Sequence, residues 1–161
     1  MSNGIRYDSL LVRHLAREID ARLRGRTALA LRLDPGERRA SLELDGDSLV
    51  MELHPTRGWI VEAPPAPAPD IRPLHRSARV ARVHAPADER LLRIDFAGST
   101  SESRPIRALV LELMTNQLNA IALDDDGRIV ALLRPRRAGE RDLRPGRPYA
   151  LPAGAPREGA D

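Results

Sequence analysis

The sequence predicts a β-rich α+β fold, an antiparallel β-sandwich with one N-terminal helix. Apolar residues recur with a helical period near the N-terminus, and beyond residue 25 they alternate with polar residues along short segments separated by turn-forming residues. A chain of 161 residues is long enough for one domain with a substantial core. We therefore expect a single domain over residues 1–152 and a small, polar, disordered tail over residues 153–161.

The first element is an amphipathic helix. Its apolar stripe recurs every four residues, at Leu11, Leu15, Ile19 and Leu23, with Val12 and Ala16 beside it. Asp8 is suited to cap the N-terminus of this helix, and Gly25 stands where a C-terminal cap glycine belongs. One helix is expected to end before the strands begin.

Past this helix the hydrophobic period changes to two residues. We expect short strands over residues 28–33, 40–44, 49–53, 59–61, 78–84 and 91–96. Turn-forming residues such as Asp34-Pro35-Gly36 and Asp45-Gly46 separate the first of them, which is typical of an antiparallel meander. The proline-rich stretch at 63–73 fits no regular element, because proline removes backbone donors, and it predicts an exposed connector.

Residues 109–134 predict a hairpin of two apolar strands joined by a tight turn at residues 124–127, Asp-Asp-Asp-Gly. Glu112 and Asn119 interrupt this apolar sequence. A buried carboxylate or amide costs free energy unless it is hydrogen-bonded. Two interpretations stay open: the pair fixes the fold by clamping backbone groups or capping a strand end, or it contacts a ligand.

The charge composition is unusual, because all 26 basic residues are arginine. Against 23 acidic residues they give a net charge of only +3. Arginine presents a planar fork that matches phosphate oxygens, so this composition suits nucleic-acid contact. A GC-rich genome, which encodes arginine and alanine readily, is the simpler explanation of the same composition. The absence of cysteine excludes disulfides and cysteine-based zinc or redox sites, and the four histidines have no metal-like spacing, so we expect no metal and no cofactor.

The N-terminal sequence lacks the basic start, apolar run and cleavage site of a signal peptide. No apolar run approaches the roughly 20 residues that a membrane helix needs. We therefore expect a cytoplasmic protein with no membrane partner. The sequence leaves the oligomeric state open.

The hairpin sequence resembles the N-terminal domain of the NFACT family, the RqcH-like ribosome quality-control factors also known as fibronectin-binding-like proteins. The similar positions are Glu112, Leu113, Met114, Asn119, Leu123, Asp124, Gly127 and Ile129. The helical segment 5–25 and the segment 145–149 resemble flanking parts of the same domain, so the resemblance spans residues 4–152. It implies the fold of the N-terminal β-sandwich of formamidopyrimidine-DNA glycosylase. A family helix with an L-R-K-like sequence is represented here only by residues 74–76, Leu-His-Arg.

The resemblance further implies an RNA- and ribosome-binding domain that engages tRNA on obstructed large ribosomal subunits. In the family an Asp-Arg pair precedes a strand, and the register of residues 91–96 aligns that pair with Glu89 and Arg90, or with Asp88 after a one-residue shift. An arginine can bind a phosphate or stack on an unpaired base, and a carboxylate can accept from an exposed base edge, so we expect Arg90 with Glu89 to make the main tRNA contact. Weaker phosphate contacts are expected at Arg79, Arg82 and Arg93, and residues 134–137 form either a solvated loop or another RNA contact. The alternative is a degenerate protein-interaction or scaffold domain that has lost nucleic-acid binding.

Enzymatic activity is not expected. Glycosylases of the related fold use an N-terminal proline followed by a glutamate, because a secondary amine can form a Schiff base with the sugar. This sequence begins Met1-Ser2-Asn3, and it contains no P-loop, nucleophile elbow or dinucleotide fingerprint. No small-molecule substrate is therefore expected, and the expected partners are tRNA and the large ribosomal subunit.

Overall fold

The computed structural model describes residues 8–54, 57–63, 71–86, 90–97, 106–114, 118–138 and 141–152. One helix, α1 (Ser9–Leu23), precedes the strands. The first half of the sheet comprises β1 (Thr27–Asp34), β2 (Arg39–Leu44), β3 (Ser48–His54) and β4 (Arg57–Ala63). The second half comprises β5 (His75–His84), β6 (Leu91–Ala97), β7 (Ala108–Glu112), β8 (Asn119–Leu123) and β9 (Ile129–Leu132). A separate hairpin, β10 (Arg136–Ala138) with β11 (Arg141–Leu143), follows.

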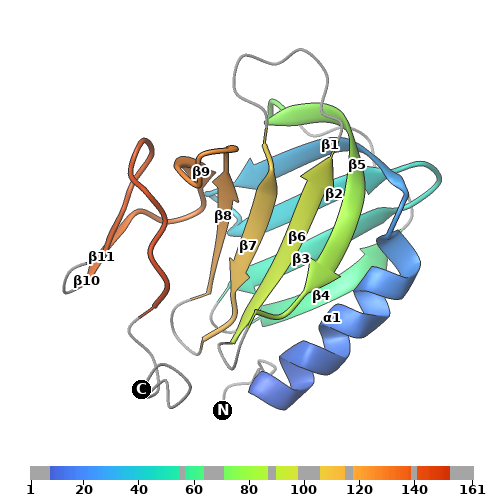
Figure 1. Cartoon of the computed structure of the whole chain (residues 1–161), viewed down its shortest axis with the longest axis horizontal. Coiled ribbons are helices and arrows are strands. Elements are labelled where there is room, and N and C mark those ends of the chain that lie inside the picture. Colours follow the sequence, from blue (N-terminus) through green and yellow to red (C-terminus); the bar gives the residue numbers. More distant parts are fainter. Residues whose placement is uncertain are drawn as a thin grey trace.

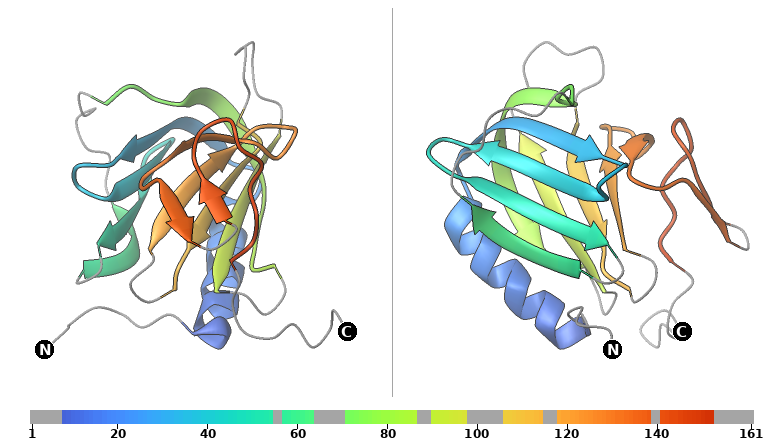
Figure 2. Two further views of the ribbon diagram at one scale, coloured as in Figure 1. Left: turned by 90° about the vertical axis from the view of Figure 1, so that its left-hand side faces the viewer. Right: turned by 180° about the vertical axis from the view of Figure 1, so that it is seen from behind.

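Nine strands form one antiparallel sheet in the order β4-β3-β2-β1-β5-β6-β7-β8-β9. The sheet folds over on itself, so that β1–β4 lie as one layer behind β5–β9 (Figures 1 and 2). The helix α1 runs along the end of these layers beside β5 (Figure 1). The predicted fold class, a β-rich α+β sandwich with one N-terminal helix, is confirmed.

The main hydrophobic core lies between the two layers and the helix. The helix contributes Val12, Ala16, Ile19 and Leu23, all buried. The predicted stripe was therefore partly wrong: Leu11 is exposed and Leu15 is only partly buried, because the buried face is rotated toward Val12 and Ala16. The predicted caps are correct: Asp8 accepts a 2.7 Å hydrogen bond from the Leu11 N–H, and Gly25 has a φ of +84°.

The region predicted as a two-stranded hairpin contains three strands. The chain reverses between β7 and β8, so that Glu112 and Asn119 are direct partners across the ladder. Every residue of β7 and β8 is buried, so the alternation that marks a half-exposed strand is missing and the break between the strands was not recognised. The turn at residues 124–127 is confirmed, with Asp124 accepting hydrogen bonds from the Asp126 and Arg128 N–H groups.

A second, smaller hydrophobic cluster lies on the other face of the sheet. Outward side chains of β6–β9 pack there against Leu143 and Tyr149 of the C-terminal segment, residues 141–152. The strands β10 and β11 were not predicted, and Arg136 and Arg137 belong to β10 rather than to a free loop. Most of the proline-rich connector and the predicted disordered tail, 153–161, lie outside the described residues.

Candidate functional site

The outer face of β5 and β6 carries the predicted arginines of the middle of the chain. A β-bulge in β5, seen as a register shift between Val80 and Arg82, lets successive residues 81 and 82 both face solvent. Arg79 and Arg82, three residues apart, are therefore both exposed on this face. Within the described part of the chain, neither forms an ion pair with a carboxylate.

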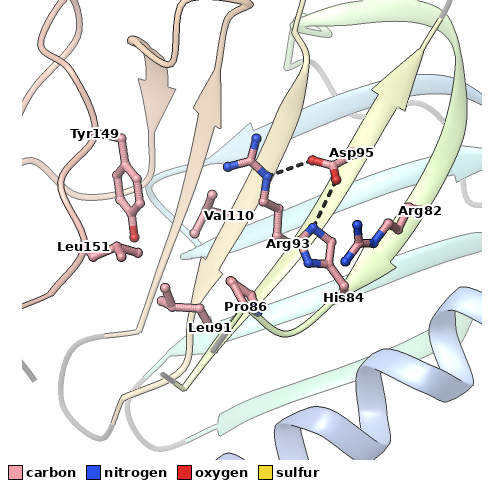
Figure 3. Close-up of a pocket in the computed structure, with 9 residues that line it drawn as sticks. All are labelled: Arg82, His84, Pro86, Leu91, Arg93, Asp95, Val110, Tyr149 and Leu151. Atoms are coloured by element: carbon pink, nitrogen blue, oxygen red, sulfur yellow. Dashed lines mark hydrogen bonds and ion pairs between the residues drawn. The ribbon is translucent and has the colours of Figure 1, made fainter. Parts of the chain in front are cut away.

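Beside these arginines the structure contains a cavity of about 480 Å³. Its floor is the outer face of β5, β6 and β7, and its far wall is the C-terminal segment (Figure 3). The lining residues are Arg82, His84, Pro86, Leu91, Arg93, Asp95, Val110, Tyr149 and Leu151. Elements that are far apart in sequence thus meet around one cavity.

The charged wall of the cavity is organised by Asp95. Its Oδ1 accepts a 2.7 Å hydrogen bond from Arg93 Nε, and its Oδ2 lies 3.0 Å from His84 Nε2 (Figure 3). Burial lowers the pKa of His84 below its ordinary value of 6.5; Asp95 acts in the opposite direction, and the charges of Arg82 and Arg93 lower the pKa further. With His84 neutral, the two arginines and one aspartate leave a net charge of +1 on this wall.

Behind the apolar wall lies a buried polar cluster. Glu112 is fully buried, and its Oε2 accepts hydrogen bonds from Arg141 Nη2 and, at 2.6 Å, from the Tyr149 hydroxyl. Arg141 also donates from Nε to the Ala150 carbonyl at 3.1 Å. Leu91 of the cavity is the ladder partner of Glu112. Glu112 therefore joins the sheet to the segment that carries the cavity residue Tyr149.

Asn119 contacts backbone groups, which is the fold-fixing arrangement considered for it. Its Nδ2 donates to the Arg134 carbonyl at 2.9 Å, and its Oδ1 accepts from the Arg134 N–H at 3.1 Å. The amide thus holds the chain where it leaves β9. Glu112, in contrast, contacts side chains of the C-terminal segment rather than backbone groups.

The predicted site residues are only partly brought together. Arg82 and Arg93 both line the cavity, and Arg79 lies on the same strand face as Arg82. Arg90 is half-buried immediately before β6, where its carbonyl accepts a 2.9 Å hydrogen bond from the Leu113 N–H. Glu89 and Asp88 lie outside the described residues.

The sequence did not predict a binding role for the other polar cavity residues, His84, Asp95 and Tyr149. A signal existed for Asp95, because it follows Arg93 by two residues and both occupy outward positions of an alternating strand. Nothing in the sequence places Tyr149 against β6, because that contact depends on the path of the C-terminal segment.

On the layer formed by β1–β4, arginines form ion pairs with neighbouring carboxylates. Around β1–β3 the pairs are Arg26–Asp47, Arg32–Glu43 and Arg39–Glu52. Partly exposed pairs of this kind contribute little to stability, but they neutralise the surface on which they lie. The outer face of β5 therefore differs from the layer formed by β1–β4.

The described residues include one group of three acids close enough to share a cation, Asp124, Asp125 and Asp126. Two of them are exposed, and Asp124 Oδ1 already accepts two backbone hydrogen bonds that shape the turn. This group is a feature of the turn and supports no metal site.

Comparison with known proteins places the fold. No family model matches the chain, and no curated protein matches it. Similar solved structures include the N-terminal domain of the fibronectin-binding protein PavA from Streptococcus pneumoniae, with a TM-score of 0.73, 17% sequence identity and 92% of this chain covered. The N-terminal part of the fibronectin/fibrinogen-binding protein from Streptococcus suis gives a TM-score of 0.76, 17% identity and 92% coverage. The fibrinogen-binding protein from Staphylococcus aureus gives a TM-score of 0.71, 17% sequence identity and 94% coverage of this chain.

The matches cover 62%, 62% and 58% of those three chains, so this sequence corresponds to a part of each. At 17% identity the likeness concerns the fold. Within the described residues, no helix is long and apolar enough to cross a membrane. The chain shares the fold found in N-terminal domains of streptococcal fibronectin- and fibrinogen-binding proteins.

Proposed function

We propose that this domain is a non-enzymatic RNA-binding module of the NFACT type, which engages tRNA on obstructed large ribosomal subunits. The hairpin motif around Glu112 and Asn119 supports the family, and so does the fold shared with fibronectin-binding-like domains. The observation that carries the proposal is the exposure of Arg79 and Arg82 on β5, neither of which forms an ion pair within the described residues. Arg93 of β6 lines the same cavity as Arg82.

The bulge in β5 exposes both arginines on one face of the sheet, where they are accessible to phosphate groups. Arginine forks bind phosphate oxygens without sequence preference, and each contact releases counterions from the RNA. Arg79 and Arg82 form no close ion pair with a carboxylate of the described residues, although the charge of Arg82 acts on Asp20, so an RNA phosphate displaces no existing ion pair. The proposed contact with phosphate therefore does not require an existing arginine–carboxylate ion pair to be broken.

The test is an anisotropy titration with labelled tRNA at two salt concentrations. We expect binding at low salt. The double variant Arg79→Glu/Arg82→Glu should weaken it at least about tenfold. It should also reduce the slope of the logarithm of the binding constant against the logarithm of the salt concentration, by roughly one per lost phosphate contact. Arg17→Glu, an exposed arginine on α1, makes the same charge change as either single variant and serves as the control. No binding at low salt, or equal losses for Arg82→Glu and Arg17→Glu, would contradict the proposal.

A protein-interaction domain is the second candidate. It is favoured by the ion pairs around β1–β3, which neutralise that layer. The proteins with a similar fold include ones named for binding fibronectin or fibrinogen. Surface plasmon resonance with immobilised fibronectin or fibrinogen distinguishes the two functions. Binding to these proteins that is insensitive to Arg79→Glu/Arg82→Glu, together with no tRNA binding, would favour this candidate.

A further inference from the structure

The cavity beside β5 has two chemically different walls. One wall is charged: His84 and Asp95 lie there between the guanidinium groups of Arg93 and Arg82 (Figure 3). The opposite side and the floor are apolar, formed by Leu91, Val110 and Leu151 together with the ring of Tyr149 and Pro86. A ligand that fits both walls has an apolar part and one anionic group.

The anionic group of such a ligand would bind at the arginines of the charged wall. The Nε of Arg93 is engaged by Asp95, but no hydrogen bond from its terminal nitrogens is formed within the described residues. Arg82, on the neighbouring strand, also forms no close ion pair with a carboxylate of the described residues. Two guanidinium groups and one carboxylate leave net positive charge, which favours a phosphate over a neutral or cationic group.

The apolar end has a rigid wall. Tyr149 is held by its hydroxyl on Glu112 Oε2 at 2.6 Å, and its ring also lies 5.9 Å from the Arg141 guanidinium carbon. Aromatic and apolar side chains of this kind accept nucleobases by stacking. The volume of about 480 Å³ falls in the range of roughly 300–1,000 Å³ usual for small-ligand sites.

We propose that this cavity binds one nucleoside monophosphate unit, with its phosphate on the wall that carries Arg93 and Arg82 and its base against Tyr149, Leu91 and Leu151. The unit is either a free mononucleotide or an unpaired nucleotide of a bound RNA. This inference deepens the proposed function, with which it shares Arg82. It adds a site for a base to a surface otherwise suited to phosphates alone.

The first test uses the full chain and nuclear magnetic resonance titration with adenosine 5′-monophosphate and uridine 5′-monophosphate. We expect saturable shifts at the His84 ring, the Tyr149 ring and the Arg82 and Arg93 side chains. Adenosine, which lacks the phosphate, should bind at least about fivefold more weakly, because charge-assisted hydrogen bonds are the stronger ones. No shift at these groups up to saturating nucleotide would count against the cavity as a nucleotide site.

Two variants probe the walls without removing buried groups. Arg82→Gln should weaken nucleotide binding at least about fivefold, because it removes one of two phosphate donors. Leu151 is 43% exposed, so Leu151→Glu places a carboxylate at the cavity without disturbing a core, and we expect it to abolish the shifts. Leu10→Glu makes the same change at a 73% exposed position of α1 and should leave binding unaltered.

Titration of tRNA with the same variants separates the two sources of the nucleotide. Loss of tRNA affinity in Leu151→Glu, but not in Leu10→Glu, supports an RNA nucleotide in the cavity. Nucleotide binding with no effect of Leu151→Glu on tRNA supports a free mononucleotide. If tRNA binding depends on Arg79 while neither mononucleotide acts and Leu151→Glu has no effect, this inference falls and the proposed function stands. If mononucleotides bind and tRNA does not, the proposed function falls and this inference stands.

Discussion

At the scale of single residues, Glu112 is the side chain on which the outer face of the domain depends. It lies fully buried at the end of β7, where it accepts hydrogen bonds from Arg141 and Tyr149. Its second oxygen, Oε1, has no hydrogen-bond partner within the described structure. A buried ion pair is stabilising only while both partners remain, since each charge alone is strongly disfavoured in a dry interior.

We therefore expect Glu112→Ala to lower the free energy of unfolding by about 3–5 kcal/mol, because it leaves Arg141 buried and uncompensated. The double variant Glu112→Leu/Arg141→Leu should recover much of that loss, because it removes both charges. Urea unfolding followed by circular dichroism measures the difference. A single variant as stable as the wild type, or a double variant no better than the single, would show that the pair is not coupled in this way.

At the scale of elements, Asp20 fastens the helix to the sheet. Its Oδ1 accepts a 2.7 Å hydrogen bond from the Val83 N–H of β5, and Arg24 donates to the same carboxylate from the next turn of α1. Burial by itself raises the pKa of Asp20, but the hydrogen bonds from Val83 and Arg24, with the charges of Arg24 and Arg82, lower it below 3.8. The carboxylate therefore stays charged in the folded protein near neutral pH.

Asp20→Ala should reduce the free energy of unfolding by about 1–3 kcal/mol, since it leaves the buried Val83 N–H without an acceptor. Asp20→Asn should cost less, because the amide oxygen can still accept that hydrogen bond. Amide hydrogen exchange at Val83 is the specific measurement: we expect faster exchange in Asp20→Ala than in Asp20→Asn. Equal exchange in both variants and the wild type would show that this bond does not hold α1 to β5.

At the scale of the whole molecule, the folded sheet creates two distinct faces. The inner face and α1 enclose the main core, while the outer face of β5–β9 carries the second cluster and the cavity covered by the C-terminal segment. His84 titrates as part of this outer face, and its pKa lies below 6.5 because of burial, against the effect of Asp95. The domain therefore has an acid-sensitive group at its proposed binding site.

The sign of the resulting pH dependence follows from proton linkage. Between the lowered folded pKa of His84 and its unfolded value of 6.5, the unfolded chain binds more protons. The stability associated with His84 is thus fully present above pH 6.5 and declines as the pH falls below it. We expect His84→Gln to flatten the fall of the urea midpoint between about pH 7.5 and 5.5. Identical slopes for wild type and variant would contradict this.

The local patterns predicted most of the secondary structure. Near residue 25 the spacing of apolar residues changes from about four, which follows the turns of a helix, to two, which follows the alternating sides of a half-buried strand. The turn at 124–127 was predictable from its own residues. Where this alternation is lost, prediction fails: β7 and β8 are buried on both faces, so their division was not visible. The bulge that turns Arg82 outward was likewise not predicted.

By itself, the sequence determined the β-rich fold class, the helix with its caps, and the arginines on which the proposed function rests, because each depends on neighbours within a few residues. Only the tertiary structure decided what Glu112 binds and which side chains share the cavity. Arg82, Asp95, Val110 and Tyr149 meet because of strand register, the bulge in β5 and the path of the C-terminal segment. These are set by packing between distant parts of the chain, which no local pattern records.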